Sequence, residues 1–236
     1  MNDSSPNTNA RPTQAGPPLA PLAAISLGLL LAGLVVGVVL AGGVMPLPYG
    51  SAAEIQDYVM ANHAAAVAIA VGTFGSSIPL AIYAATASAR LRQLGITAPG
   101  ATIALAGGLL ASTGLGLSGL LVWTLSRPEV TSEPALTRAL YYLTYLTGGA
   151  WHVVALGLLI AGIAVPGLVV ALLPRGVALT GLAIAALAEL ATLVLIWERL
   201  SPLLPVARFT GLLWLIVAGA MLPLRRANKQ QAVARS

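Results

Sequence analysis

Two ionisable side chains lie deep inside the long apolar segments of this sequence. Glu189 stands in the segment GLAIAALAELATLVL, about twelve residues into an apolar run over 177–197. His152 lies about twelve residues into another apolar run that begins near residue 140. If the two runs are consecutive antiparallel helices, these side chains have a similar depth. A carboxylate at the centre of a bilayer costs on the order of 3 kcal/mol, so we expect Glu189 to face the bundle interior, either protonated or paired with His152.

A polar and aromatic stripe precedes His152 in the sequence. Its spacing of i, i+3, i+4, i+7 and i+11 places its members on one helix face. The stripe consists of Tyr141, Thr144, Tyr145, Gly148 and His152. Two interpretations stay open. The stripe lines a cavity that admits a ligand or a proton to Glu189, or Tyr145 and His152 only form hydrogen bonds between helices.

Arg208 completes the predicted site, together with Glu189, His152, Tyr145 and Tyr141. It lies near the start of the last apolar run, over 204–222. A long cationic side chain at that position can extend to the membrane interface. Alternatively, it forms an ion pair at the outer mouth of the bundle. The candidate partners are Glu54, Asp57, Glu129, Glu133 and Glu198.

Other kinds of chemistry find little support. The chain has no cysteine, which excludes disulfides and thiolate metal sites. Its two histidines differ in depth by about 15 Å, too far apart to share one haem iron, and His152 with Glu189 would be a poor zinc site. No serine-hydrolase, Walker or metalloprotease motif occurs. We therefore expect no catalytic residue, no metal and no cofactor. Enzyme activity would require Glu189 and His152 to share one cavity with Ser76, Ser77 or Arg208.

The composition places these residues in a membrane protein. Hydrophobic residues make up 58% of the 236 residues and charged residues only 8%, and the mean hydropathy is +0.89. A soluble domain carries about 25% charged residues. The net charge of +5 is scattered singly at segment ends, which argues against a nucleic-acid partner. The long apolar runs show no alternation with a period of two, so we predict an all-α bundle rather than a β-barrel.

About six transmembrane helices are predicted, within a single domain over 21–224. The expected spans are 22–44, 60–87, 101–125, 140–163, 177–197 and 204–222. At Pro166 the fourth span either ends or continues as a kinked helix to residue 173. Residues 1–20 are predicted to be a disordered N-terminal tail and 225–236 a basic C-terminal tail.

The basic residues predict how these helices are oriented. Arg90, Arg92 and Arg175 lie in two turns on one side, and four more basic residues lie in the C-terminal tail. The loops on the opposite side are richer in acids. By the positive-inside rule both termini are cytoplasmic, and we expect the protein in the inner membrane of a bacterium.

Small residues recur at intervals of four along two spans. Gly33 and Gly37 form one such step in the first span. Ala104, Gly108, Ser112 and Gly116 form a longer series in the third span. Such series allow helix backbones to approach closely within lipid, so we expect them to be helix contacts.

Several segments resemble an uncharacterised bacterial membrane family, the domain of unknown function 4386 family. They are SAAEIQDYV at 51–59, GSSIPLAIYAATASARLRQLG at 75–95, SRPEV at 126–130, LTGGAWHVV at 146–154, AALAELATL at 185–193 and RFTGLLWLIVAGAMLP at 208–223. The resemblance implies a six-helix membrane protein of this length. It implies no activity and no site residues.

Three functions follow from these observations. The first is a non-enzymatic membrane protein that binds or passes a small ligand, ion or proton at Glu189 and His152. The second is an accessory or assembly subunit of a larger membrane complex, for which small-residue stripes and short loops are suitable. An intramembrane enzyme that acts on a lipid or isoprenoid is the third. The partners in these schemes are the lipid bilayer, the ligand, and a second copy or a complex subunit.

Overall fold

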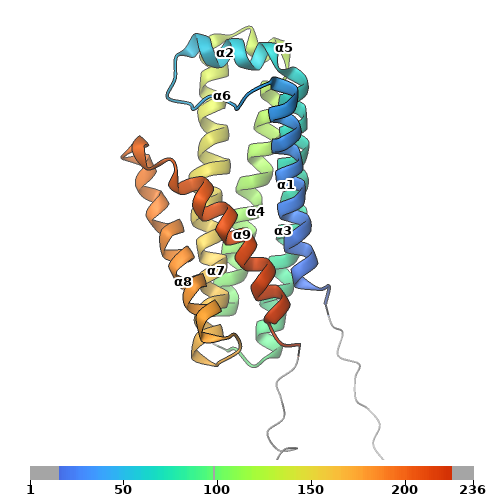
Figure 1. Ribbon diagram of the computed structural model, residues 1–236, viewed down its shortest axis with the longest axis vertical. Helices are drawn as coiled ribbons and strands as arrows, with labels where there is room; N and C mark the ends of the chain where they lie inside the picture. Colours follow the sequence, from blue (N-terminus) through green and yellow to red (C-terminus); the bar gives the residue numbers. More distant parts are fainter. Residues whose placement is uncertain (1–15, 98, 225–236) are drawn as a thin grey trace, which may run out of the picture.

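The computed structural model describes residues 16–97 and 99–224 of the chain (Figure 1). The predicted C-terminal tail, 225–236, and most of the predicted N-terminal tail lie outside the described residues. Leu19 and Ala20, which were assigned to the N-terminal tail, already belong to the first helix. That helix therefore runs over Leu19–Ala41 rather than over the predicted 22–44.

The described residues form helices and no strand, so the all-α prediction is confirmed. The elements are α1 (Leu19–Ala41), α2 (Ala52–Ala61), α3 (His63–Gln93), α4 (Gly100–Leu125), α5 (Pro128–Thr131), α6 (Pro134–Leu146), the π-turn η1 (Thr147–Trp151), α7 (His152–Val169), α8 (Arg175–Leu190), the 3₁₀ turns η2 (Ala191–Leu195) and η3 (Glu198–Leu200), and α9 (Leu203–Met221).

Local sequence explains several of the helix ends. The Ser51 hydroxyl accepts a hydrogen bond of 3.1 Å from the Glu54 N–H and so caps α2. α5 and α6 each begin at a proline, which has no N–H to leave unpaired in a first turn. α1 ends at Gly42, whose φ of +66° is a left-handed conformation that suits glycine.

Six helical stretches within the described residues are long and apolar enough to cross a membrane, as predicted. They are Leu19–Ala41, His63–Gln93, Gly100–Leu125, Pro134–Val169, Arg175–Leu195 and Glu198–Met221. Large apolar side chains such as Val39, Val71 and Val169 are exposed on their outer faces, where the lipid bilayer covers them. The chain is therefore a multi-pass membrane protein.

The six spans form one elongated bundle (Figure 1). α2 and α5 lie across one end, which we call the α2 end. Both ends of the described chain emerge at the opposite end, which we call the terminal end. This arrangement follows from an even number of spans.

The predicted small-residue contacts are present. An added Cβ on Gly33 of α1 would lie 2.8 Å from the Cα of Gly72 in α3. One on Gly108 of α4 would lie 2.2 Å from the Cβ of Ala84 in α3. One helical turn earlier in α4, Ala104 packs closely against Gly162 of α7. α4 thus lies between α3 and α7 at distances that only small side chains allow.

The fourth span differs from its prediction. It begins at Pro134 rather than near residue 140, about 9 Å earlier along a helix. Arg138 and the polar side chains near it made this first part look like a loop in the sequence. Pro166 does not end the span, since α7 continues to Val169.

The π-turn η1 joins α6 to α7 without a break. Its sequence, TGGAW, contains two glycines, and the N–H of His152 donates to the carbonyls of Thr147 and Gly149 instead of Gly148. A π-turn adds one residue to the helix. Because one residue corresponds to about 100° of rotation, the side chains of α7 point elsewhere than the face predicted from α6.

α9 crosses the face of the bundle diagonally (Figure 1). Near its beginning, Leu204 packs against Gly149 of η1. Gly211, in its middle, packs against α7, and Gly219, near its end, packs against Leu19 of α1. α1 and α9 therefore meet at the terminal end and diverge toward the α2 end.

Candidate functional site

A cavity of about 520 Å³ lies where α1 and α9 diverge. This volume is within the range of small-molecule sites in proteins. Most of the side chains around the cavity are apolar, among them Leu30, Leu34, Met45, Leu47, Ile69, Leu115, Val122 and Leu204. The polar side chains are Thr73, Ser118, Thr144, Tyr145, Ser201 and Arg208. The site is thus an apolar chamber with a small polar wall.

Arg208 of α9 supplies the charge in this wall. Its guanidinium Nη2 donates a hydrogen bond to the backbone carbonyl of Gly148. In an α-helix that carbonyl would accept from the N–H of His152, but the π-turn diverts this N–H to other carbonyls. The π-turn therefore creates the acceptor that holds Arg208 in place.

No carboxylate partner was found for Arg208 within the described residues. The predicted ion pairs with Glu54, Asp57, Glu129, Glu133 or Glu198 are absent there, and the prediction is wrong for this part of the chain. The Nε of the guanidinium is buried and has no hydrogen-bond partner in the part of the chain that the structure describes. A guanidinium that keeps an unpaired donor and an uncompensated charge can bind an anion.

Thr144 adds a second unpaired group to the cavity wall. Its Oγ1 is buried without a hydrogen-bond partner among the described residues, while its carbonyl accepts a hydrogen bond of 3.1 Å from the Ser118 hydroxyl. An unpaired buried polar atom costs about 1–3 kcal/mol.

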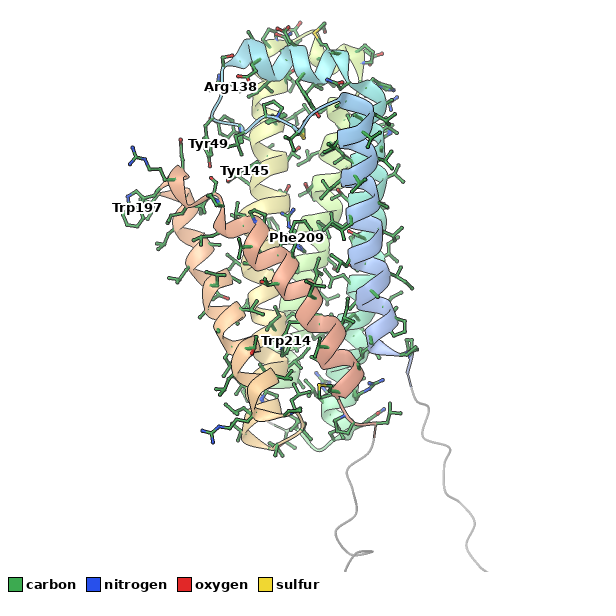
Figure 2. The ribbon with its side chains drawn as sticks, in the orientation of Figure 1. Tyr49, Arg138, Tyr145, Trp197, Phe209 and Trp214 are labelled. Atoms are coloured by element: carbon green, nitrogen blue, oxygen red, sulfur yellow. The ribbon has the colours of Figure 1, made fainter. Side chains whose placement is uncertain are left out.

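Tyr145 closes the cavity toward the α8–α9 connection. Its hydroxyl donates a hydrogen bond of 2.8 Å to the Oγ of Ser201. The edge of the Tyr49 ring packs on Tyr145, with 5.7 Å between the centroids. Figure 2 shows Tyr49 and Tyr145 side by side between α6 and that connection. Tyr145 therefore lines this cavity, which contains neither Glu189 nor His152.

Tyr141 does not line the cavity. It is buried near the α2 end with Ile55, Val59 and Leu125, and its hydroxyl donates to the carbonyl of Pro46. Pro46 belongs to the α1–α2 loop, which also contributes Met45 and Leu47 to the cavity. Tyr141 thus positions a wall of the cavity rather than lining an access path.

His152 is fully buried and lies outside the cavity lining. Its Nδ1 is 2.9 Å from the carbonyl oxygen of Ala111 in α4. A carbonyl only accepts hydrogen bonds, so Nδ1 carries a proton. The Nε2 atom is buried and has no hydrogen-bond partner among the described residues. The predicted pairing with Glu189 is wrong, because the π-turn rotates His152 toward α4 and the earlier start of the span changes its depth.

Glu189 does not face the bundle interior either. Its side chain is exposed on α8, and one carboxyl oxygen lies 3.2 Å from the position of an added Cβ on Gly157. Gly157 follows His152 by about one and a half helical turns. Contact between α7 and α8 is made by Ala185 and Ala188, which occupy the inner face of α8 instead.

The sequence singled out some of the cavity residues and missed others. Thr144 and Gly148 belong to the predicted stripe, and Tyr145 and Arg208 to the predicted site. Ser118 and Ser201 resemble the hydroxyl residues that occur throughout membrane helices. The paired glycines of TGGAW were the one local sign that η1 departs from an α-helix.

Comparison with protein-family models, with curated proteins and with solved structures finds no match to this chain. The resemblance to the domain of unknown function 4386 family therefore stays a prediction.

Proposed function

We propose that this membrane protein binds a small molecule with an anionic group, and that Arg208 is the counter-charge. Ligand binding was the function expected from the sequence, but the expected site was the Glu189–His152 pair. The proposed site is the cavity instead. We also propose the orientation predicted from the basic residues. Both termini are then in the cytoplasm of a bacterium, and the cavity is in the outer half of the inner membrane.

One observation carries this proposal. Arg208 is held in a mostly apolar cavity by a backbone carbonyl, with no carboxylate neutralising it among the described residues. Charged side chains within a membrane are costly and generally pair with an opposite charge. An anionic ligand would supply that charge, and Thr144 would supply a hydroxyl beside it.

The other predicted residues have supporting roles. Tyr145 closes one side of the site, and Tyr141 fixes the loop that carries Met45 and Leu47. His152 anchors the helix below the π-turn to α4. Glu189 lies outside the cavity lining and takes no part in anion binding.

Isothermal titration calorimetry on the full chain in phosphatidylcholine nanodiscs tests the proposal. The probe is butyl phosphate, and butanol is the neutral comparison. We expect Arg208→Gln to weaken butyl phosphate binding by about ten- to a hundredfold, since a hydrogen bond to a charged group contributes about 1.5–3 kcal/mol. Binding of butanol should change little.

Two further variants are controls for this experiment. Arg199→Gln removes an exposed arginine at the α8–α9 connection, outside the cavity lining, and should bind as the wild type does. Arg208→Lys keeps the charge without the planar donor array and should have intermediate affinity. Equal affinity of the wild type and Arg208→Gln for butyl phosphate would contradict the proposal.

A further inference from the structure

We infer that the anionic molecule is a lipid, whose acyl chain lies in the cavity and enters from the bilayer between α1 and α9. The inference rests on the proposed function, because it takes the anionic group at Arg208 as given. It adds the chemical class of the ligand and its route.

The walls of the cavity match an acyl chain better than a compact polar anion. Leu30 and Leu34 of α1, Ile69 of α3 and Leu115 of α4 extend the apolar surface away from Arg208. A small anion such as phosphate would use only the polar wall and leave these side chains uncovered. Each methylene that moves from water to such a surface gains about fourfold in affinity.

The cavity is bordered by α1 on one side and by α9 on another. The two helices contact each other where Gly219 packs on Leu19, at the terminal end. Both helices line the cavity farther along, through Leu34 on one side and Pro205 on the other. In Figure 1, α9 runs diagonally away from α1 over this stretch. A chain from the surrounding lipid can therefore enter between them.

The α2 end of the cavity offers a less direct route. The α1–α2 loop covers it with Met45 and Leu47, and Tyr141 holds this loop through the Pro46 carbonyl. On the adjacent side, the hydroxyl of Tyr145 is bonded to Ser201. A ligand from the aqueous phase would have to displace these contacts, whereas a lipid would not.

Photolabelling of the full chain in phosphatidylcholine nanodiscs tests the inference. The probe is dodecyl phosphate with a diazirine in its chain, and peptide mass spectrometry locates the label. We expect label on α1 near Leu34 and on α9 near Leu204. Leu34→Trp, which fills the cavity, should reduce that label at least tenfold. The matched control is Leu31→Trp, at an exposed site on the same helix, which should leave it unchanged.

The route is tested separately with the naturally cysteine-free chain. Leu34→Cys and Pro205→Cys, joined by a reducible bismaleimide, should block labelling until a reductant opens the tether. Each single variant treated with the same reagent is the control. This tethering experiment remains informative even if the Leu34→Trp variant fails to fold.

The outcomes separate the inference from the proposed function. Label that persists at full yield across the closed tether overturns the bilayer route. Dodecyl phosphate that binds no more tightly than butyl phosphate overturns the lipid class. In both cases, the proposed function would still hold if Arg208→Gln weakens butyl phosphate binding. If Arg208→Gln does not weaken it, both the proposed function and the lipid inference are wrong.

Discussion

Arg208 illustrates how a membrane protein can hold a charge without an opposite charge. Its guanidinium is fixed by the Gly148 carbonyl, and a backbone acceptor orients the cation without neutralising it. A carboxylate partner would have oriented the guanidinium and also neutralised its charge. The charge consequently stays available to a ligand, which is the basis of the binding proposal.

Tyr145 allows a second test at the scale of single residues. Tyr145→Phe removes the hydroxyl that donates to Ser201 but keeps the ring that packs on Tyr49. We expect a loss of about 1 kcal/mol in the free energy of unfolding. Amide hydrogen exchange should also become faster over 197–201, because the α8–α9 connection loses its bond to α6.

Tyr142→Phe is the matched control for this variant. The Tyr142 ring also packs edge-on against Tyr49, with 6.2 Å between the centroids, and no hydrogen bond of its hydroxyl to another described residue was found. Its unfolding free energy and exchange rates should equal those of the wild type. Similar changes in both variants would show that the ring contacts, rather than the Tyr145 hydroxyl, hold the connection.

The π-turn is the element on which the site depends. It frees the Gly148 carbonyl for Arg208 and rotates His152 away from Glu189. The π-turn itself therefore contacts α9 through the Gly148 carbonyl, whereas the start of α7 contacts α4 through His152. π-turns often occur at functional sites, and here the reason is visible in the acceptor that the turn provides.

The contact between α1 and α3 provides a test at the scale of elements. Gly72→Ala would place a Cβ 2.5 Å from the Gly33 Cα, so the helices must move apart. We expect a loss of about 1–3 kcal/mol in the free energy of unfolding, measured by SDS titration with circular dichroism. Because α1 also forms a cavity wall, butyl phosphate binding should weaken as well.

Gly28→Ala is the control, because an added Cβ there meets nothing within 4 Å. Alanine favours a helix more than glycine does, so this variant should be as stable as the wild type or slightly more stable. If both substitutions had the same effect, helix propensity rather than close packing would explain it.

At the scale of the whole molecule, both described chain ends lie at one end of the bundle and the cavity lies toward the other. The basic turns predict that the terminal end is cytoplasmic. The cavity would then be in the outer half of the membrane, where it would meet lipids of the outer leaflet.

Single cysteines test this orientation, since the chain has none of its own. Ser132→Cys lies at the α2 end and Gln93→Cys at the terminal end, and both positions are exposed. In intact spheroplasts we expect a membrane-impermeant maleimide to label Ser132→Cys alone. Labelling of Gln93→Cys should require permeabilisation. The reverse pattern would invert the proposed topology and place the cavity in the inner half.

The sequence by itself determined the all-α fold, the six spans and the small residues at which helices meet, because long apolar runs and glycine spacing act through local periodicity. It also singled out Tyr145 and Arg208, which line the same cavity. Only the tertiary structure decided that Arg208 donates to the Gly148 carbonyl, that His152 points toward α4 and that Glu189 is exposed. One extra residue in the π-turn shifts every later side chain by about 100°, and a regular helical period cannot reveal that shift.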